Sequence, residues 1–394
     1  MTRIPRDRDN DYTQEMMAAR RDFVRDRTGE GLDHVGRTSF DPAGLPGNIE
    51  HAMGAAQVPI GLAGPLTIHG EHVGPDEDIY VPMATTEGTL VASYNRGMRL
   101  LRECGGARVT IVERFMQRAP VFHFDGARDA RDFGLWLDAN FDGVKRAAET
   151  TTSVGKLSHI ETYSVGAMLY TRMNFTTGDA AGQNMSGKAA FAACQWIAAN
   201  YPGPMRGYTL SGAIDTDKKH SQLNTLHSRG ARVIAEVVLE PEKTKALMRA
   251  TTAQLFRVRN VSHTGGMLAG TSSNGLHAAN GLAALFIATG QDAANVAESQ
   301  ASISFVDLRD DGSLYWSLTL PSLIMATFGG GTGLPTQREC LSMLGCVGPE
   351  NGKGKVGRLL EITAATVLAG ELSLSSAIVA GDWVSSHDEL GRNR

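Results

Sequence analysis

The stretch KLSHIETYSVGAMLYTRMNFTTGDAAGQNMSGKAAFAACQWIAAN, residues 156–200, contains the hairpin and the helix around which the smaller part of the fold is organised. Lys156–Tyr163 and Val165–Phe175 are predicted as two strands. Gln183–Asn200 is predicted as a helix. A strand pair followed by a helix forms the second half of a split β-α-β-β-α-β unit.

The residues on either side complete that unit. Val121–Phe124 is predicted as a strand, Asp129–Thr150 as a helix, and Met205–Leu210 as the closing strand. The order is that of a ferredoxin-like domain. We therefore predict a small α/β domain over residues 119–210.

The rest of the chain is predicted to be mainly helical. Leu90, Tyr94, Met98 and Leu101 recur at spacings of four, four and three, which places them on one helix face. Further helices are predicted at Lys218–Leu239, Pro241–Leu255, Leu276–Gly290 and Gly357–Ser385. The last two are rich in Ala, Gly and Ser, a composition that suits close helix packing.

The predicted fold class is α+β, a mainly helical large domain with the ferredoxin-like small domain inserted in it. The large domain is expected at residues 46–118 and 211–380. A charged N-terminal helical arm is expected at residues 1–45 and a C-terminal flap at residues 381–394.

Composition limits the classes of partner. The 394 residues are 42% hydrophobic and 20% charged, with a net charge of −4, which is typical of a globular protein without a general attraction to nucleic acid or anionic lipid. The N-terminus has no apolar signal segment, and the longest apolar runs are too short to span a membrane. The four cysteines form no C-x-x-C pair and no zinc spacing. We expect a cytoplasmic protein with no metal, nucleic-acid or membrane partner.

Several short motifs have side chains suited to chemistry on a carbonyl group. A carboxyl near a helix start can exchange protons, and a lysine ammonium can stabilise an oxyanion. Small residues at a strand-to-helix turn let backbone N–H groups approach phosphate. Each motif also has a plain structural explanation, as a helix cap, a charged surface loop, a flexible glycine loop or a tail histidine. The motifs are TTEG (85–88), TGDAAGQNM (177–185), DTDKKH (215–220), GQD (290–292), FGGGTG (328–333) and SSH (385–387).

The order of these motifs along the chain resembles that of the hydroxymethylglutaryl-coenzyme A reductase family. The resemblance runs from about residue 45 to residue 390 and also includes PIGLAGPL (59–66), LHAAN (276–280), GGGTGLP (329–335) and AGELSL (369–374). It implies a large domain that binds an acyl-CoA thioester and a small domain that binds the nicotinamide cofactor. It also implies a homodimer or higher oligomer with its sites at the subunit interface.

The resemblance assigns four catalytic residues. Lys218 stabilises the oxyanion, Glu87 acts as general acid, and Asp292 tunes the pKa values of both. His387 protonates the departing CoA thiolate.

Binding residues follow from the same resemblance. The substrate-binding positions are Arg118, Ser211, Asp217, Lys219, Asn280 and Ser386. The cofactor-binding positions are Asp179, Gly182, Asn184, Lys156, Gly329, Gly330 and Gly331. NADPH is the expected cofactor, with NADH possible, because Lys156 could pair with the 2′-phosphate and no acidic residue beside it would repel that group.

The implied reaction is the four-electron reductive deacylation of 3-hydroxy-3-methylglutaryl-CoA to mevalonate and CoA by two NADPH. Ala213, His220 and Asn260 depart from the family pattern near the acyl pocket, where Arg259 is available to replace a lysine. The alternative is therefore a reductase of the same fold that acts on a different acyl-CoA thioester.

Overall fold

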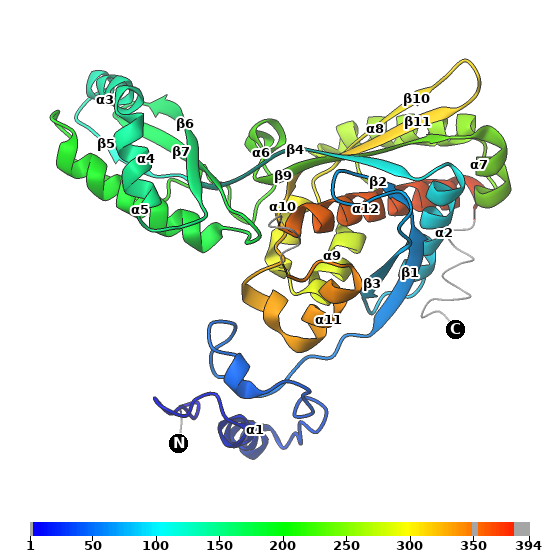
Figure 1. Ribbon diagram of the computed structural model, residues 1–394, viewed down its shortest axis with the longest axis horizontal. Helices are drawn as coiled ribbons and strands as arrows, with labels where there is room; N and C mark the ends of the chain where they lie inside the picture. The colour runs from blue at the N-terminus through cyan, green and yellow to red at the C-terminus, as the bar shows by residue number, and fades with distance from the viewer. Residues whose placement is uncertain (1–2, 349–353, 382–394) are drawn as a thin grey trace.

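The computed structural model describes residues 3–348 and 354–381, a mixture of helices and strands (Figure 1). The N-terminal arm carries helix α1 (Gln14–Thr28) and the short turn η1 (Pro42–Gly44) and is drawn below the body in Figure 1. The Thr13 side chain caps α1 by accepting a hydrogen bond from the N–H of Met16, and Gly29 ends the helix at φ 75°. A small cluster of buried apolar residues holds the arm together; its members are Met17, Leu45 and Ala52, with Leu334 packed against them.

One long strand connects the two parts of the main sheet. β4 (Ala107–Arg118) pairs along its first part with β9 (Gly230–Leu239) and through its last three residues with β7 (Met168–Thr176). β9 continues the sheet to β11 (Leu314–Leu323) and then to β10 (Ile303–Leu308). A separate pair, β1 (Ile60–Leu66) and β3 (Ile79–Ala84), precedes α2 (Leu90–Glu103), and β2 (Ile68–His69) lies beside β4.

On the other side of β4 lies the smaller unit. Its strands are β5 (Val121–His123), β6 (Lys156–Val165), β7 and β8 (Gly207–Thr209), and they pair antiparallel in the order β8-β5-β7-β6. Its helices are α3 (Ala127–Ala139), α4 (Phe141–Glu149) and α5 (Gln183–Asn200). The unit has its own hydrophobic core, in which Phe122 and Phe133 pack ring to ring.

Helices from the second half of the chain fill the larger part. They are α6 (Gln222–His227), α7 (Pro241–Met248), α8 (Thr252–Ala269), α9 (Ala278–Thr289), η2 (Ala293–Asn295), α10 (Val296–Ser299), η3 (Gly330–Gly333), α11 (Pro335–Met343) and α12 (Val356–Ala380). α12 is long and apolar enough to cross a membrane, but 83% of its most apolar window is buried inside the protein. It is therefore placed as the central helix of the larger core, where it contacts α2, α9 and β9.

Three of the predicted helices differ in the structure. The helix predicted at Pro241–Leu255 is two helices, α7 and α8, because Arg249 ends the first at φ 54°. Gly230–Leu239, predicted as part of a helix, is strand β9, and its alternate residues Ala231, Val233, Ala235, Val237 and Leu239 are buried. The hairpin of β10 and β11 was not predicted at all. The helix predicted at Asp129–Thr150 is two helices that divide at Asn140.

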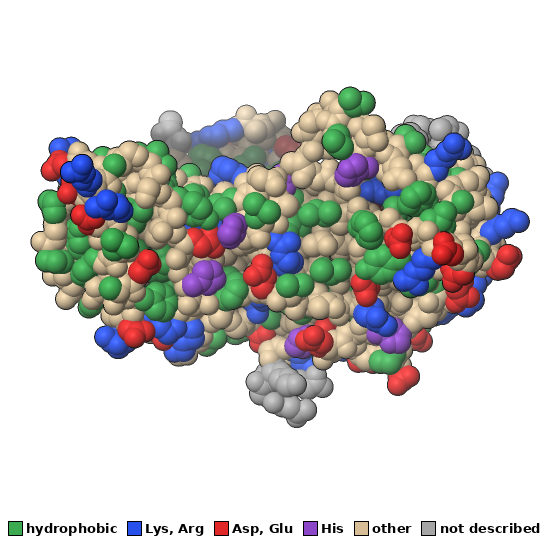
Figure 2. All heavy atoms as spheres, turned by 90° about the horizontal axis from the view of Figure 1, so that it is seen from above, with side chains coloured by type: hydrophobic (Ala, Val, Ile, Leu, Met, Phe, Trp, Pro, Cys, Tyr) green, Lys and Arg blue, Asp and Glu red, His purple; other side chains and the backbone are tan. Residues whose placement is uncertain are grey.

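Figure 2 shows the molecule from above. Lys and Arg side chains are interspersed with Asp and Glu side chains on this face. Neither sign of charge dominates it, in keeping with the small net charge of −4.

Candidate active site

Lys218 and Asp292 form the ion pair around which the site is built. Nζ of Lys218 lies 2.9 Å from Oδ2 of Asp292, and both side chains remain a little over two-fifths exposed. The hydrogen bond that the Lys218 ammonium donates to Asp292 raises the pKa of Lys218, and partial burial opposes that effect. Asp292 is itself fixed at the start of η2, where its side chain accepts a hydrogen bond from the N–H of Ala294 at 3.1 Å. Lys218 is thus held as an ammonium ion that is open to a ligand.

The loop that carries Lys218 has an unusual backbone. Ala213, Thr216 and Lys218 have φ angles of 65°, 55° and 56°, in the left-handed region that residues with a Cβ avoid. Neighbouring groups hold this shape. Asp217 accepts hydrogen bonds from Nη2 of Arg229 at 2.6 Å and from Nε2 of Gln183 at 3.2 Å.

Three predicted substrate-binding residues surround the same loop. Arg118 lies 3.3 Å from the buried Asp215 carboxylate and donates to the carbonyl oxygen of Gln183. The Ser211 hydroxyl is 3.4 Å from both oxygens of Asp215. Nζ of Lys219 donates to the carbonyl oxygen of Asp217 at 3.0 Å. The structure therefore brings Arg118, Ser211, Asp217 and Lys219 together beside Lys218.

Glu87 lies in the turn between β3 and α2 rather than in the first turn of the helix. Its side chain is exposed, and its N–H donates to the Thr85 hydroxyl at 3.0 Å. The pKa of Tyr94 is raised well above its ordinary value by burial, by Glu371 and, to a smaller extent, by the charge of Glu87.

The side chain of Asn280, on α9, is oriented by the buried side chain of His277. Its Nδ2 is 3.0 Å from Nδ1 of His277, whose pKa burial lowers to about 4. The neutral ring nitrogen therefore accepts, and the amide oxygen of Asn280 is left to face away from it. The buried carboxylate of Glu371 fixes the start of this segment by accepting the N–H groups of Leu276 and His277. Tyr94 adds a hydrogen bond to the carbonyl oxygen of His277.

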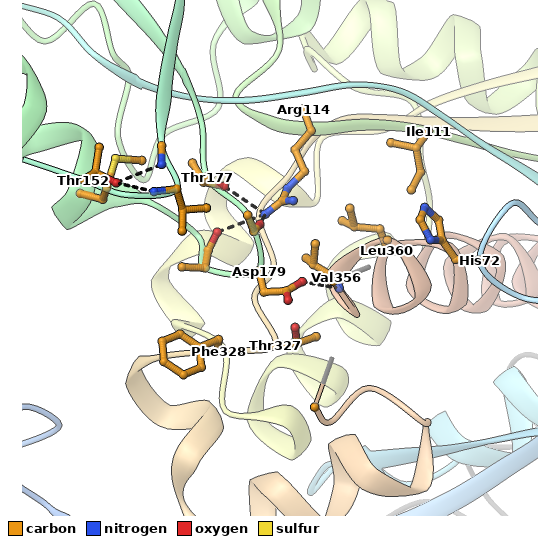
Figure 3. A pocket seen from close by; sticks show the side chains of 18 residues that line it. His72, Ile111, Arg114, Thr152, Thr177, Asp179, Thr327, Phe328, Val356 and Leu360 are labelled. Carbon is orange, nitrogen blue, oxygen red and sulfur yellow. Dashed lines mark hydrogen bonds between the residues drawn. The ribbon is translucent and has the colours of Figure 1, made fainter. Parts of the chain in front are cut away.

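A cavity of about 780 Å³ lies where the smaller unit meets α12 and the loop after β11 (Figure 3). Arg114 lines it and donates from Nη2 to Thr177 Oγ1 at 3.0 Å, to the carbonyl oxygen of Ala180 at 3.1 Å and to that of Gly178. Burial lowers the pKa of Arg114 to about 10, which still leaves it charged at neutral pH. Sequence reasoning missed Arg114, because nothing in the local pattern of β4 distinguishes it.

Asp179, a predicted cofactor residue, lines the same cavity. Its backbone oxygen accepts the N–H of Thr327 at 2.9 Å, and its Oδ1 accepts the N–H of Val356 at 3.1 Å, at the start of α12. These two bonds tie the smaller unit to the larger one at the cavity wall (Figure 3).

The other predicted cofactor residues differ in their placement. Gly182 precedes α5 at φ 88°, and Asn184 is exposed in the first turn of that helix. Lys156 extends to Glu149 at 3.2 Å, while its neighbours Val154 and Gly155 line the cavity.

The three glycines after Phe328 have two different roles in the backbone. Gly329 and Gly330 have φ angles of 85° and 57° and face open space. A Cβ on Gly331 would lie 2.7 Å from the carbonyl oxygen of Gly290, so that glycine serves close packing near Asp292. The predicted Ser386 and His387 lie outside the described residues. Among residues 3–348 and 354–381, no group of three or more His, Cys, Asp or Glu side chains is placed to hold a metal ion.

A family model described as hydroxymethylglutaryl-coenzyme A reductase matches residues 16–392, nearly the whole chain. The chain belongs to this family. The reductase named 3-hydroxy-3-methylglutaryl-coenzyme A reductase of Aeropyrum pernix is 42% identical over 96% of the chain and 90% of its own length. That of Methanocaldococcus jannaschii is 40% identical over 95% and 92%.

Solved structures of reductases share the fold. A class II 3-hydroxy-3-methylglutaryl-CoA reductase from Streptococcus pneumoniae, bound to NADPH in open conformations, matches with a TM-score of 0.66. The match covers 83% of this chain and 86% of that one at 18% identity. The family resemblance inferred from the sequence is confirmed by the family model and the archaeal relatives.

The structure contradicts one suggestion made from the sequence about the acyl pocket. Arg259, suggested above as a replacement for a lysine at Asn260, is buried and donates to the carbonyl oxygen of Asn274 at 2.6 Å. Its guanidinium also lies 3.9 Å from Glu371. Arg259 is therefore committed to the core, and the suggestion that it grips the acyl group is wrong.

Proposed function

We propose that this reductase converts 3-hydroxy-3-methylglutaryl-CoA to mevalonate and CoA with two NADPH. The observation that carries the proposal is the Lys218–Asp292 pair, 2.9 Å apart and still accessible, in a chain that matches the family over nearly its full length. Negative charge develops on the thioester carbonyl oxygen at each reduction, and an ammonium ion is suited to stabilise it.

The proposed reaction assigns a task to each catalytic side chain. Lys218 stabilises the oxyanion of the hemithioacetal and later polarises the aldehyde. Glu87, in its exposed turn, delivers a proton to the carbonyl oxygen. Asp292 keeps Lys218 charged, as the raised pKa of that lysine supports. His387, outside the described residues, protonates the leaving thiolate.

The residues around the 780 Å³ cavity fit a phosphate-bearing dinucleotide. The volume is in the range of ligand pockets, and Arg114 supplies positive charge beside a wall rich in glycine: Gly155, Gly178, Gly354 and Gly357. When bound, the cofactor supplies hydride to the carbonyl carbon. Asp179 holds the wall in place through its bond to the N–H of Val356. The segment from Gly182 to Asn184 lies between the lining residues Ala180 and Met185, and the Gly329–Gly331 loop follows the lining residue Phe328. We propose NADPH rather than NADH, with Arg114 nearer to the cavity than Lys156.

The domain assignment is part of the same proposal. Residues 46–118 and 211–380 form the acyl-CoA-binding domain, residues 119–210 the ferredoxin-like NADPH-binding domain and residues 1–45 the arm. The C-terminal flap predicted at residues 381–394 lies, apart from residue 381, outside the described residues. Two separate hydrophobic cores support this division, and so does the antiparallel strand order β8-β5-β7-β6.

We also propose that the reductase acts in the cytoplasm as a homodimer or larger oligomer with its sites between subunits. The second half of α8 exposes Val261, Met267 and Leu268, with relative exposures of 65%, 71% and 87%, an apolar surface that a second copy would cover. Met267→Glu combined with Leu268→Glu should give monomers in light scattering. An oligomer unchanged by these substitutions would remove α8 from the interface.

A reductase acting on another acyl-CoA is the second candidate. It is favoured by Ala213, which lies in the strained loop without a polar side chain, and by Asn260, which is exposed on α8. A panel of acyl-CoA thioesters separates the two candidates, since a wide preference for 3-hydroxy-3-methylglutaryl-CoA would eliminate the second.

The deciding experiment follows reduced nicotinamide by absorbance while a thiol reagent counts released CoA. Two NADPH oxidised per thiol are expected. Lys218→Ala should lower turnover by at least about 10²-fold, whereas Lys243→Ala, at an exposed ion pair with Glu240, should leave it unchanged. No oxidation of either cofactor by the folded protein would reject the proposed reaction.

A further inference from the structure

The first and last residues of the short segment from Asp292 to Glu298 both bind Lys218. Asp292 receives the ammonium group at 2.9 Å. Glu298, six residues later in α10, accepts the backbone N–H of Lys218 on Oε1 at 3.1 Å. One carboxylate therefore fixes the side chain and the other fixes the backbone of the same lysine.

Glu298 is completely buried, and so is its counter-ion Arg229. Nε of Arg229 lies 3.0 Å from Oε2 of Glu298. Nη2 of Arg229 then donates to Asp217 at 2.6 Å, the residue immediately before Lys218. Asn224 of α6 completes the surroundings, with its Nδ2 3.5 Å from Oε2. A continuous polar network thus runs beneath the lysine loop.

The loop needs such support because its backbone is strained. Thr216 and Lys218 both adopt left-handed φ angles, which persist only where neighbouring groups fix them. The contact from Glu298 falls at the strained residue 218, and that from Arg229 at residue 217, between the strained residues 216 and 218. Without an acceptor for its N–H, Lys218 would relax toward a common backbone conformation, and its ammonium would leave Asp292.

We propose that Glu298 is a positioning residue of the reductase, which together with Arg229 fixes the backbone of Lys218 so that its ammonium meets Asp292 and the substrate oxyanion. The resemblance to the family assigns no role to Glu298. The reaction it serves rests on the proposed function, whereas the placement of Lys218 can be measured without substrate.

The electrostatics of Glu298 add a pH dependence. Burial raises its pKa to about 7, against the lowering effects of Arg229 and of the Lys218 N–H, while Asp217 raises it further. The groups that face it are Arg229 from the start of β9, Asp217 and Lys218 from the loop, and the neutral Asn224 from α6. The ionised carboxylate is the stronger acceptor. Turnover should therefore fall as the pH drops through about 7.

Two variants of Glu298 distinguish the effect of losing the hydrogen-bond acceptor from the effect of losing the negative charge. Glu298→Met removes the acceptor at similar volume, and Arg229 keeps Asp217 as its partner. We expect kcat to fall by about 10²-fold, the effect of a misplaced catalytic group, with the KM for NADPH unchanged. Glu298→Gln keeps a neutral acceptor, like the protonated carboxyl of the wild type, so its kcat should lie between those of the wild type and Glu298→Met and should not decline near pH 7.

A substrate-free readout keeps the inference separate from the proposed reaction. Acylation by limiting acetic anhydride at pH 8, followed by peptide mass spectrometry, compares Lys218 with the exposed Lys243. Loss of the Asp292 contact lowers the pKa of Lys218, so its relative labelling should rise in Glu298→Met. Glu361→Met is the matched control, because Glu361 is equally buried but accepts N–H groups of residues 71–73 instead.

The outcomes are distinct. Faster labelling of Lys218 in Glu298→Met, with wild-type labelling in Glu361→Met, supports the inference even if the protein proves inactive on 3-hydroxy-3-methylglutaryl-CoA. Wild-type labelling of Lys218 in the folded Glu298→Met variant overturns it. If that variant does not fold, Glu298→Gln decides: a wild-type pH profile overturns the inference, and loss of the decline near pH 7 supports it.

Discussion

Replacing Gly97 with alanine tests how tightly α2 is packed against the central helix α12. Gly97 is buried in the middle of α2. A Cβ at this position would lie 1.9 Å from the carbonyl oxygen of Ala369, 2.5 Å from its carbonyl carbon and 2.9 Å from its Cα. These are backbone atoms of a buried helix, so no side-chain rotation can relieve the contact.

Two effects of opposite sign decide the outcome. Alanine is favoured over glycine within a helix by about 1 kcal/mol. Against this, carbon–oxygen contacts of about 3.3–3.6 Å are the normal close approach, so the two helices would have to separate by more than ~1 Å. Overpacking of a core costs about 1–3 kcal/mol, sometimes more, and a gap of ~1 Å forfeits up to half of each contact along the interface. We expect a net loss of at least ~2 kcal/mol.

Calorimetry of Gly97→Ala measures the effect. Since ~1 kcal/mol corresponds to about 2–4 °C in domains of some 200 residues, the Tm should fall by several degrees. Gly134→Ala in α3 is the matched control, because a Cβ there would meet only the Leu169 side chain at an ordinary 3.5 Å. It should be neutral or stabilising by up to ~1 kcal/mol. A Gly97→Ala variant as stable as the wild type, beside a control that behaves as expected, would refute the reasoning.

Three further predictions concern the site. Lys218→Met should lower kcat by about 10²–10³-fold, as expected when one oxyanion-stabilising group is lost, and a near-normal kcat would contradict that role. Arg114→Leu should raise the KM for NADPH by roughly tenfold, the equivalent of ~1.4 kcal/mol, because Arg114 holds the 177–180 loop at the cavity wall. The KM for the acyl-CoA should not change, and an equal rise in both KM values would indicate a general distortion of the protein instead. Burial lowers the pKa of His277 to about 4, below its ordinary 6.5, so the unfolded chain binds a proton that the folded chain excludes as the pH falls from about 6.5 to 4. Stability lost in that window should be smaller in His277→Gln than in the wild type by thermal denaturation, and identical slopes would exclude His277 as the cause.

The smaller unit was largely predictable from the sequence. The helix predicted at Gln183–Asn200 is confirmed as α5 with the same bounds, and the strands around it appear within a few residues of their predicted positions. Local pattern suffices there because strands and helices alternate over short distances. Only the break at Asn140, which divides α3 from α4, was missed.

The larger part was harder because its strands pair over long distances. GARVIAEVVL, residues 230–239, has the two-residue alternation of a half-buried strand, but it follows the short helix α6 and was merged with it into one long helix. β9 is stabilised by β4 and β11, which lie about a hundred residues away on either side. The alternation indicates a strand, but nothing within the segment indicates which distant strands it pairs with.

Some residues of the candidate site could likewise be predicted from the sequence, and others could not. The resemblance identified Lys218 and Asp292 as candidates, and the structure places them in contact. Glu298 was not identified, because nothing in the local sequence VAES indicates that this glutamate is completely buried. It is buried beneath the loop that contains Lys218, 80 positions earlier in the chain. Arg114 was missed for a similar reason, since its partners at residues 177–180 approach it only once β4 and β7 have paired.

The position of α12 in the chain has a consequence for synthesis on the ribosome. The core of the smaller unit draws on residues 122–210 alone, so it can fold as soon as that stretch has emerged. The larger core cannot close at that stage, because its central helix, residues 356–380, is among the last parts to be made. Until then the faces of α2, α9 and β9 that cover α12 are exposed apolar surface. A nascent chain stalled before residue 356 should therefore be a substrate for chaperones that bind apolar segments, while its smaller unit is already folded.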